Sequence, residues 1–185
     1  MMKKRALCLP ALLAALALTA CSLPGAQDGY HEGRMGDTME TYFFDYTVNS
    51  ATLAASYADA VPADGSNFLI VDITVKNTSP QSIEMYDTDF QAQWGSEGEE
   101  DYRVPITTDM STGEELPTLD DAQLPGTYPL AIDEEVEGIL VYEVPAGFQD
   151  FSISYLEYFD DESTGDVYFV YFTAEGDAGS GAVSA

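Results

Sequence analysis

The sequence has very little cysteine and histidine, and their scarcity argues against several kinds of chemistry. Its 185 residues contain two cysteines, Cys8 and Cys21, and a single histidine, His31. His31 lies in a stretch rich in glycine and small residues that we expect outside the folded domain. A Ser–His–Asp triad or a His-ligated zinc site needs a histidine within the domain. We therefore predict that the domain contains neither.

Basic residues are also scarce. Lys and Arg number 6 against 33 Asp and Glu, which gives a net charge of −27, and all the acidic residues follow Cys21. Nucleic-acid binding relies on Lys and Arg at phosphates, so nucleic acid is not an expected partner. Attraction to an anionic membrane by charge is excluded in the same way. With 45% hydrophobic and 12% aromatic residues, the chain is nevertheless too apolar to be wholly disordered.

No apolar run is long enough to cross a bilayer as a helix, which takes roughly 20 residues. The first apolar run, residues 6–18, follows the basic residues at positions 3–5, a pattern typical of a secretory signal peptide, here residues 1–20. Residues 18–21, Leu-Thr-Ala-Cys, resemble the bacterial lipobox, whose Cys is lipidated and becomes the mature N-terminus. We therefore predict a protein held in the cell membrane by lipid on Cys21 and facing outside the cytoplasm.

Lipidation of Cys21 would leave no thiol for a disulfide or a nucleophile in the mature chain. Residues 22–36 are rich in Gly, Ser and Asp and lack apolar periodicity, so with Cys21 they are predicted to form a flexible tether, residues 21–36. The small and polar residues 174–185 are predicted to be a disordered tail.

Between tether and tail, apolar and polar residues alternate with a period of two. Six such runs, rich in β-branched and aromatic residues, are separated by Gly, Pro, Asn and Asp. The predicted strands are residues 42–48, 69–76, 89–94, 136–144, 151–155 and 167–173. We expect an all-β, two-sheet antiparallel sandwich over residues 37–173, with a closed barrel as the alternative. Trp94 lies on an apolar face and is expected to pack in the core.

Several segments together resemble a bacterial family of lipoproteins with a telokin-like, immunoglobulin-like domain of unknown function. The matching segments, in order, are residues 36–38, 46–50, 67–77, 89–90 and 138–145. The resemblance spans about residues 35–173 and implies an immunoglobulin-like sandwich outside the cell, without catalytic residues to carry over. The chain departs from the family pattern in its acidity and at residues 131–135, where a tighter Gly-containing turn is usual.

One acidic loop has the spacing of the start of a calcium loop. Oxygen-bearing residues alternate at Asp160, Glu162, Thr164 and Asp166, but position twelve is Tyr171 rather than a Glu. A solvated hairpin turn is the favoured interpretation, and weak calcium binding is the alternative. Residues 97–101 and 133–137 are two further acidic loops of this kind. We therefore predict no cofactor other than, in the alternative, weakly bound calcium.

Two features are candidates for binding. Four tyrosines fall on a predicted hairpin, where they would form an exposed contact platform if they do not cap the core: Tyr155, Tyr158, Tyr168 and Tyr171. The long connection over residues 104–131 is expected to hide a short strand or helical turn, or to be a binding loop.

The function that these observations favour is a lipid-anchored extracytoplasmic binding module. Its partner would be an envelope or extracellular protein, or a glycan. The first alternative is a structural envelope spacer without a specific ligand. The second is a carboxylate-dependent hydrolase, for which Asp45 and Asp72 are the candidates because each lies within a strand, although outer-face exposure also explains them. No enzymatic activity is predicted.

Overall fold

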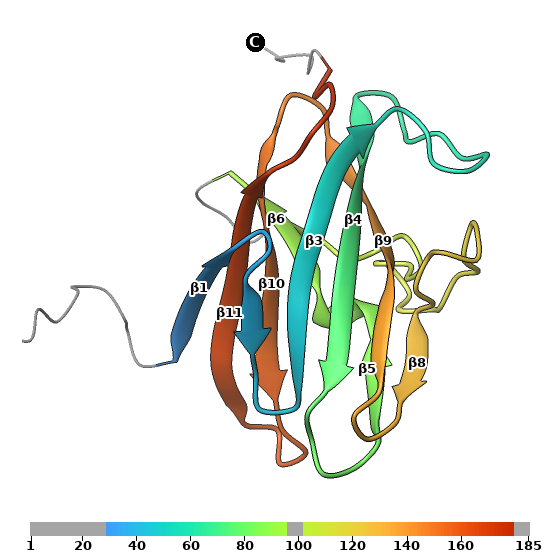
Figure 1. Cartoon of the computed structure of the whole chain (residues 1–185). Helices are drawn as coiled ribbons and strands as arrows, with labels where there is room; N and C mark the ends of the chain where they lie inside the picture. Colours follow the sequence, from blue (N-terminus) through green and yellow to red (C-terminus); the bar gives the residue numbers. More distant parts are fainter. Residues whose placement is uncertain (1–28, 96–101, 180–185) are drawn as a thin grey trace, which may run out of the picture.

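Two β-sheets packed face to face form the domain, and they confirm the predicted all-β sandwich (Figure 1). The computed structural model describes residues 29–95 and 102–179. The signal peptide, Cys21 and the acidic loop 97–101 lie outside these residues. No helix within the described ranges is long and apolar enough to cross a bilayer.

The first sheet has five strands in the order β1, β11, β10, β6, β7. Its strands are β1 (Tyr30–Arg34), β11 (Thr164–Thr173), β10 (Asp150–Tyr158), β6 (Gln91–Trp94) and β7 (Tyr102–Arg103). β10 and β11 form the predicted hairpin and pair antiparallel, whereas β1 runs parallel to β11 at the edge.

The second sheet has four antiparallel strands in the order β2, β3, β4, β9. Its strands are β2 (Thr38–Glu40), β3 (Phe44–Ala54), β4 (Ser66–Asn77) and β9 (Glu135–Pro145). A separate antiparallel pair, β5 (Ile83–Tyr86) and β8 (Thr127–Leu130), flanks this sheet, and the short 3-10 turn η1 (Asp87–Asp89) follows β5. The described strands thus form separate sheets rather than the closed barrel considered above.

Aromatic rings fill the space between the sheets. Phe44 and Tyr46 of β3 meet Phe90 and Tyr155, with ring centroids 4.7–6.3 Å apart. All four side chains are buried, and so is Trp94, which confirms its predicted place in the core. The alternation of the strands therefore places one side of each sheet in the core and leaves the other side facing outward.

The tether prediction is wrong for residues 30–34, because they form β1 and belong to the sandwich. Tyr30 pairs with Val167 and Arg34 with Tyr171 along the edge of β11. The segment Tyr-His-Glu-Gly-Arg has no apolar alternation, and its pairing depends on the neighbouring strand rather than on its own β-propensity. The chain therefore enters the domain at Tyr30.

The tail prediction is also wrong for its first residues. Glu175 accepts a backbone hydrogen bond from Leu53 (2.7 Å) and donates one to Ala51 (2.9 Å). Ala178 accepts the side-chain amide of Asn67 at 2.7 Å. Small residues here pack closely against β3 and β4, so a composition that suggested disorder allows a close backbone approach instead.

The long connection 104–131 contains the hidden strand that was expected, β8. Upstream of it, the Ile106 N–H donates to Val141 of β9 at 2.8 Å, and the Leu124 N–H donates to Ile139 at 2.9 Å. Val141 is fully buried although it lies on the outer side of β9, two residues before Glu143. The connection therefore runs along the free edge of β9, where Gln123 forms a bridge with Ile139.

Candidate functional site

The four candidate tyrosines do not form one surface. Tyr155 and Tyr168 lie opposite each other on the inner side of the first sheet and are buried. Tyr171 lies on the outer side and is half-buried, and Tyr158 at the end of β10 is 61% exposed. The expected platform is wrong for Tyr155 and Tyr168, because the cross-strand register places both toward the core.

The outer side of the first sheet carries a different surface, which we call the uncharged face. Register and alternation place eight side chains of β6, β10 and β11 at its centre: Gln91, Gln93, Ser152, Ser154, Leu156, Val167, Phe169 and Tyr171. Ser152 and Ser154 are buried beneath their neighbours, and the pair Asp150 and Thr173 follows on the same side at one end of the sheet. None of the eight is acidic or basic, in a chain with 33 acidic residues. Leu156 is 48% exposed, and its cross-strand partner Val167 is half-buried.

Edge strand β1 extends this surface with an aromatic row. The ring of Tyr30 packs on Phe169 with centroids 5.1 Å apart, and Phe169 stacks on Tyr171 at 5.9 Å. The hydroxyls of Tyr30 and Tyr171 share a hydrogen bond of 2.7 Å. The guanidinium of Arg34 lies over the ring of Tyr171, 5.4 Å from its centroid. Glu32 is the single acidic residue of β1, and its register partner is Phe169, so it lies on the outer side of the edge strand between Tyr30 and Arg34.

The outer side of the second sheet is strongly acidic. Six carboxylates project from its strands, with Lys76 as the basic residue among them: Glu40, Asp45, Asp72, Glu135, Glu137 and Glu143. Burial and the nearby Glu40 raise the pKa of Asp45, against the opposing effect of Lys76. Asp45 pairs with Lys76 and Asp72 with Ser50, so the two hydrolase candidates are not cross-strand neighbours.

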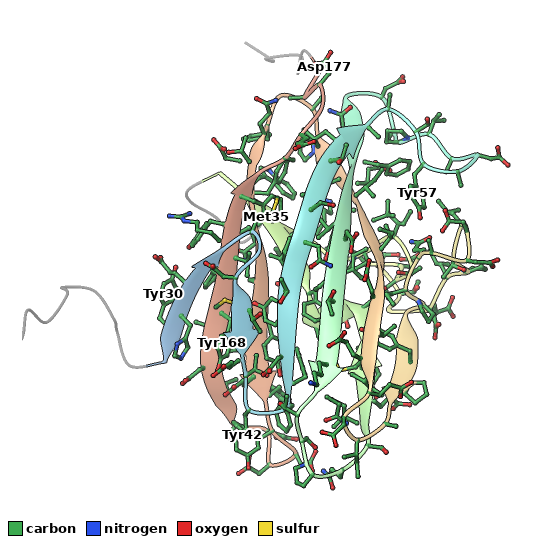
Figure 2. All side chains as sticks on the ribbon, in the orientation of Figure 1. Tyr30, Met35, Tyr42, Tyr57, Tyr168 and Asp177 are labelled. Carbon is green, nitrogen blue, oxygen red and sulfur yellow. The ribbon has the colours of Figure 1, made fainter. Side chains whose placement is uncertain are left out.

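At one end of the sandwich, a buried carboxylate supports an aromatic cluster. Glu157 is 5% exposed and accepts three hydrogen bonds, from the N–H of Tyr42 (2.8 Å), the N–H of Asp166 (3.0 Å) and the hydroxyl of Tyr168 (2.9 Å). The rings of Tyr42, Phe43 and Phe159 pack against one another with centroids 5.0–5.4 Å apart. Figure 2 shows Tyr42 at the lower end of the molecule, below Tyr168. The sequence analysis did not single out Glu157, although the alternation of this run places it on the same inward side as Phe151, Ile153 and Tyr155.

A second pair of carboxylates, Asp87 and Asp89, lies in the turn η1. Asp87 is buried, accepts the hydroxyls of Thr107 and Thr108, and has its pKa raised by burial. Asp89 accepts the N–H of Tyr86 at 3.1 Å, and burial raises its pKa to about 6. Asp87 thus links the turn to the long connection, and Asp89 links it to the end of β5.

The candidate calcium loop forms the turn between β10 and β11. Asp161 caps the loop by accepting the N–H of Ser163 at 3.1 Å, and Asp166 pairs with His31 at 2.8 Å. His31, expected in the tether, also stacks on Tyr168 with centroids 4.7 Å apart. Within residues 29–95 and 102–179, no group of three or more His, Cys, Asp or Glu side chains is arranged to hold a metal ion. Asp160, Glu162 and Asp166 are thus not brought together.

We expect calcium to leave the thermal stability of the protein unchanged, because Asp161 and Asp166 already have partners in the folded chain. The measurement is a thermal melt in EDTA, in millimolar CaCl₂ and in MgCl₂ at matched ionic strength. Equal melting temperatures in the two salts are the expected result. An increase specific to calcium would show binding to the folded state and would contradict the solvated-turn interpretation.

The comparisons with known proteins concern the fold and the family. Residues 33–167 match the family described as a domain of unknown function (DUF4352). The chain belongs to this family. The match begins within β1 and ends within β11, so the DUF4352 domain coincides with the sandwich rather than with the leader or the tail. The sequence matches no curated protein.

Solved structures are similar to this chain at low sequence identity. The ycdA protein of Bacillus subtilis, assigned as a lipoprotein, is 19% identical with a TM-score of 0.52, and the alignment covers 75% of this chain and 39% of ycdA. The chain therefore spans well under half the length of that relative. The yjhA protein of Bacillus subtilis is 15% identical (TM-score 0.47), covering 78% of this chain and 99% of yjhA. A β-sandwich protein of Clostridium difficile is 15% identical (TM-score 0.48), covering 80% and 98%.

Proposed function

We propose that this DUF4352 protein is a lipid-anchored extracytoplasmic module that acts by binding another molecule and not by catalysis. The observation that carries the proposal is the contrast between the two outer sides of the sandwich. One side bears six carboxylates, whereas the other has eight uncharged side chains at its centre, with Glu32 on β1 and Asp150 at the end of β10 beside them. A spacer that contacts only water has no need of such a difference, whereas binding surfaces are depleted in charge and enriched in Tyr and Phe at their centre.

The segment between the predicted lipid anchor and the first strand is short. The chain from Cys21 to Tyr30, where β1 begins, can span at most about 30 Å when fully extended. Lipid on Cys21 would therefore keep the sandwich close to the membrane surface. Two or more acyl chains anchor a protein stably without help from basic residues, which are scarce in this protein. The lipobox resemblance and the charged, short apolar leader support this anchor.

Changing Cys21 to Ser tests the anchor and the binding function together. We expect the wild type in the membrane pellet and the Cys21→Ser protein in the soluble fraction. A Cys21→Ser protein that still sediments with membranes would contradict the lipid anchor. The soluble protein is then purified and added to cells that lack the gene, and the bound amount is measured against concentration. Saturable binding is expected for a binding module, whereas no saturable binding would favour the spacer.

A further inference from the structure

We infer that the uncharged face is a docking surface for another protein, one that presents an apolar surface bordered by basic groups. The inference rests on the proposed binding function and adds the surface and the class of partner. The candidates for the occupant are a second copy of the chain, a nucleic acid or anionic polymer, a neutral glycan, and a protein. The charges and ring contacts around the face discriminate among them.

Charge excludes the first two classes of occupant. Each copy carries a net charge of −27, so two copies that meet through any face repel each other strongly. The same field repels nucleic acid and anionic polymers, and Arg34 is the one basic residue on the aromatic row to oppose it. The occupant is therefore neutral or basic.

Ring geometry favours a protein over a neutral glycan. A sugar ring stacks on the open face of an aromatic ring. Here Phe169 packs between Tyr30 and Tyr171, and Arg34 lies over the ring of Tyr171. The hydroxyls of Tyr30 and Tyr171 are bonded to each other. The row therefore presents an apolar ridge with few free ring faces, which suits the side chains of a protein partner. Tyr and Arg are also the residues that most often dominate protein interfaces.

The border of the face indicates the charge of the partner. Glu32 lies on the outer side of edge strand β1 beside Phe169, and Asp150 lies on the outer side of β10 at one end of the sheet. Asp160, Asp161 and Glu162 are exposed in the β10–β11 turn at the other end. An uncharged centre with acidic margins is complementary to a surface with an apolar centre and basic margins, and such margins set specificity and association rate.

The scarcity of thiols allows a direct test of occupancy. Leu156→Cys places a thiol on the uncharged face, and Ser50→Cys places one on an exposed outer position of β3 on the acidic side. Each full-length variant is labelled with a membrane-impermeant maleimide, on intact cells and after purification in detergent. The parent protein without an added cysteine measures background labelling. We expect labelling of Leu156→Cys to be about tenfold slower on cells, which corresponds to an occupancy of about nine-tenths, and that of Ser50→Cys to be unchanged.

A charge placed on the face separates specific binding from general shielding by the envelope. Tyr171→Asp is added to Leu156→Cys, with Thr74→Asp in the same background as the matched control on the second sheet. Tyr171→Asp should restore fast labelling on cells and Thr74→Asp should not. Equal labelling of Leu156→Cys on cells and after purification would overturn the inference, as would protection that survives Tyr171→Asp.

Digestion of the cell wall with a muramidase distinguishes a protein occupant from a glycan occupant. Protection that persists on digested cells and weakens in high salt supports a protein with basic margins. Protection lost on digestion and restored by adding back the solubilised glycan would overturn the protein assignment. If the Cys21→Ser protein binds cells saturably while Leu156→Cys remains fully labelled, the protein binds through another face, and the proposed function stands without this inference.

Discussion

Glu157→Ala should lower the free energy of unfolding by about 3 kcal/mol, the largest effect that we expect from a single substitution outside the apolar core. Glu157 is buried and accepts hydrogen bonds from the N–H groups of Tyr42 and Asp166 and from the hydroxyl of Tyr168. Alanine would leave these donors without an acceptor, and each unsatisfied buried donor costs about 1–3 kcal/mol. Water entering the space relieves part of this cost, so we expect about 3 kcal/mol rather than the full sum.

Denaturant unfolding of wild type, Glu157→Ala and Glu157→Gln measures this effect. The Gln amide retains one acceptor oxygen and the volume of the side chain, so its loss of stability should lie between the other two. Gly165→Ala is an independent check, because a methyl group there would collide with the carboxylate of Glu157 and come within 2.8 Å of Phe159. If Glu157→Ala were as stable as wild type, the carboxylate would not connect β10, β11 and the turn before β3 as described.

The long strands and the core could be predicted from the sequence, because their alternation is repeated over many residues. Five of the expected runs overlap β3, β4, β6, β9 and β11, and the sixth falls within β10. β1 could not be predicted, since a parallel edge strand gains its stability from β11 and needs no apolar alternation of its own. The place of His31 in the domain could not be predicted either, because its partners Asp166 and Tyr168 lie more than 130 residues away in the sequence.

The candidate site was predicted in part. The tyrosine-rich hairpin exists, and Tyr171 lies on the exposed side, whereas Tyr155 is buried on the apolar side of its own strand with Phe151 and Ile153. β11 is apolar at consecutive positions, so the side that Tyr168 faces follows only from its pairing with Tyr155. Alternation within one strand does not reveal that pairing. The absence of charge at the central outer positions of β6, β10 and β11, from Ser152 to Leu156 along β10, also becomes visible only when the three strands are placed side by side.

The free energy of unfolding should fall as the pH rises from about 4 to about 6, with a large contribution from Asp89. Burial and the neighbouring Asp87 raise the pKa of Asp89 to about 6 from an ordinary value of 3.8, against the hydrogen bond from Tyr86. Between these two pH values the folded protein binds a proton that the unfolded chain has lost, so the contribution to stability is complete below pH 4 and is lost as the pH rises through 6. The raised pKa of Asp87 acts in the same direction.

Asp89→Asn should therefore stabilise the protein at pH 7.5 by about 2 kcal/mol, since each pKa unit corresponds to about 1.4 kcal/mol and Asp89 keeps part of its exposure. The amide oxygen still accepts the N–H of Tyr86. Below pH 4 the two proteins should have equal stability, and Tm at pH 7.5 should rise by about 5 °C.

Asp109→Asn is the matched control, because it also removes one negative charge. Hydrogen bonds from the hydroxyl and the N–H of Ser111 lower the pKa of Asp109, so its ionised form stabilises the fold above pH 4 and its loss should destabilise the protein at pH 7.5. The two substitutions relieve the same amount of general repulsion and differ only in the environment of the carboxylate. Equal shifts in stability for both would mean that repulsion among the 33 acidic residues, and not burial of Asp89, sets the pH dependence.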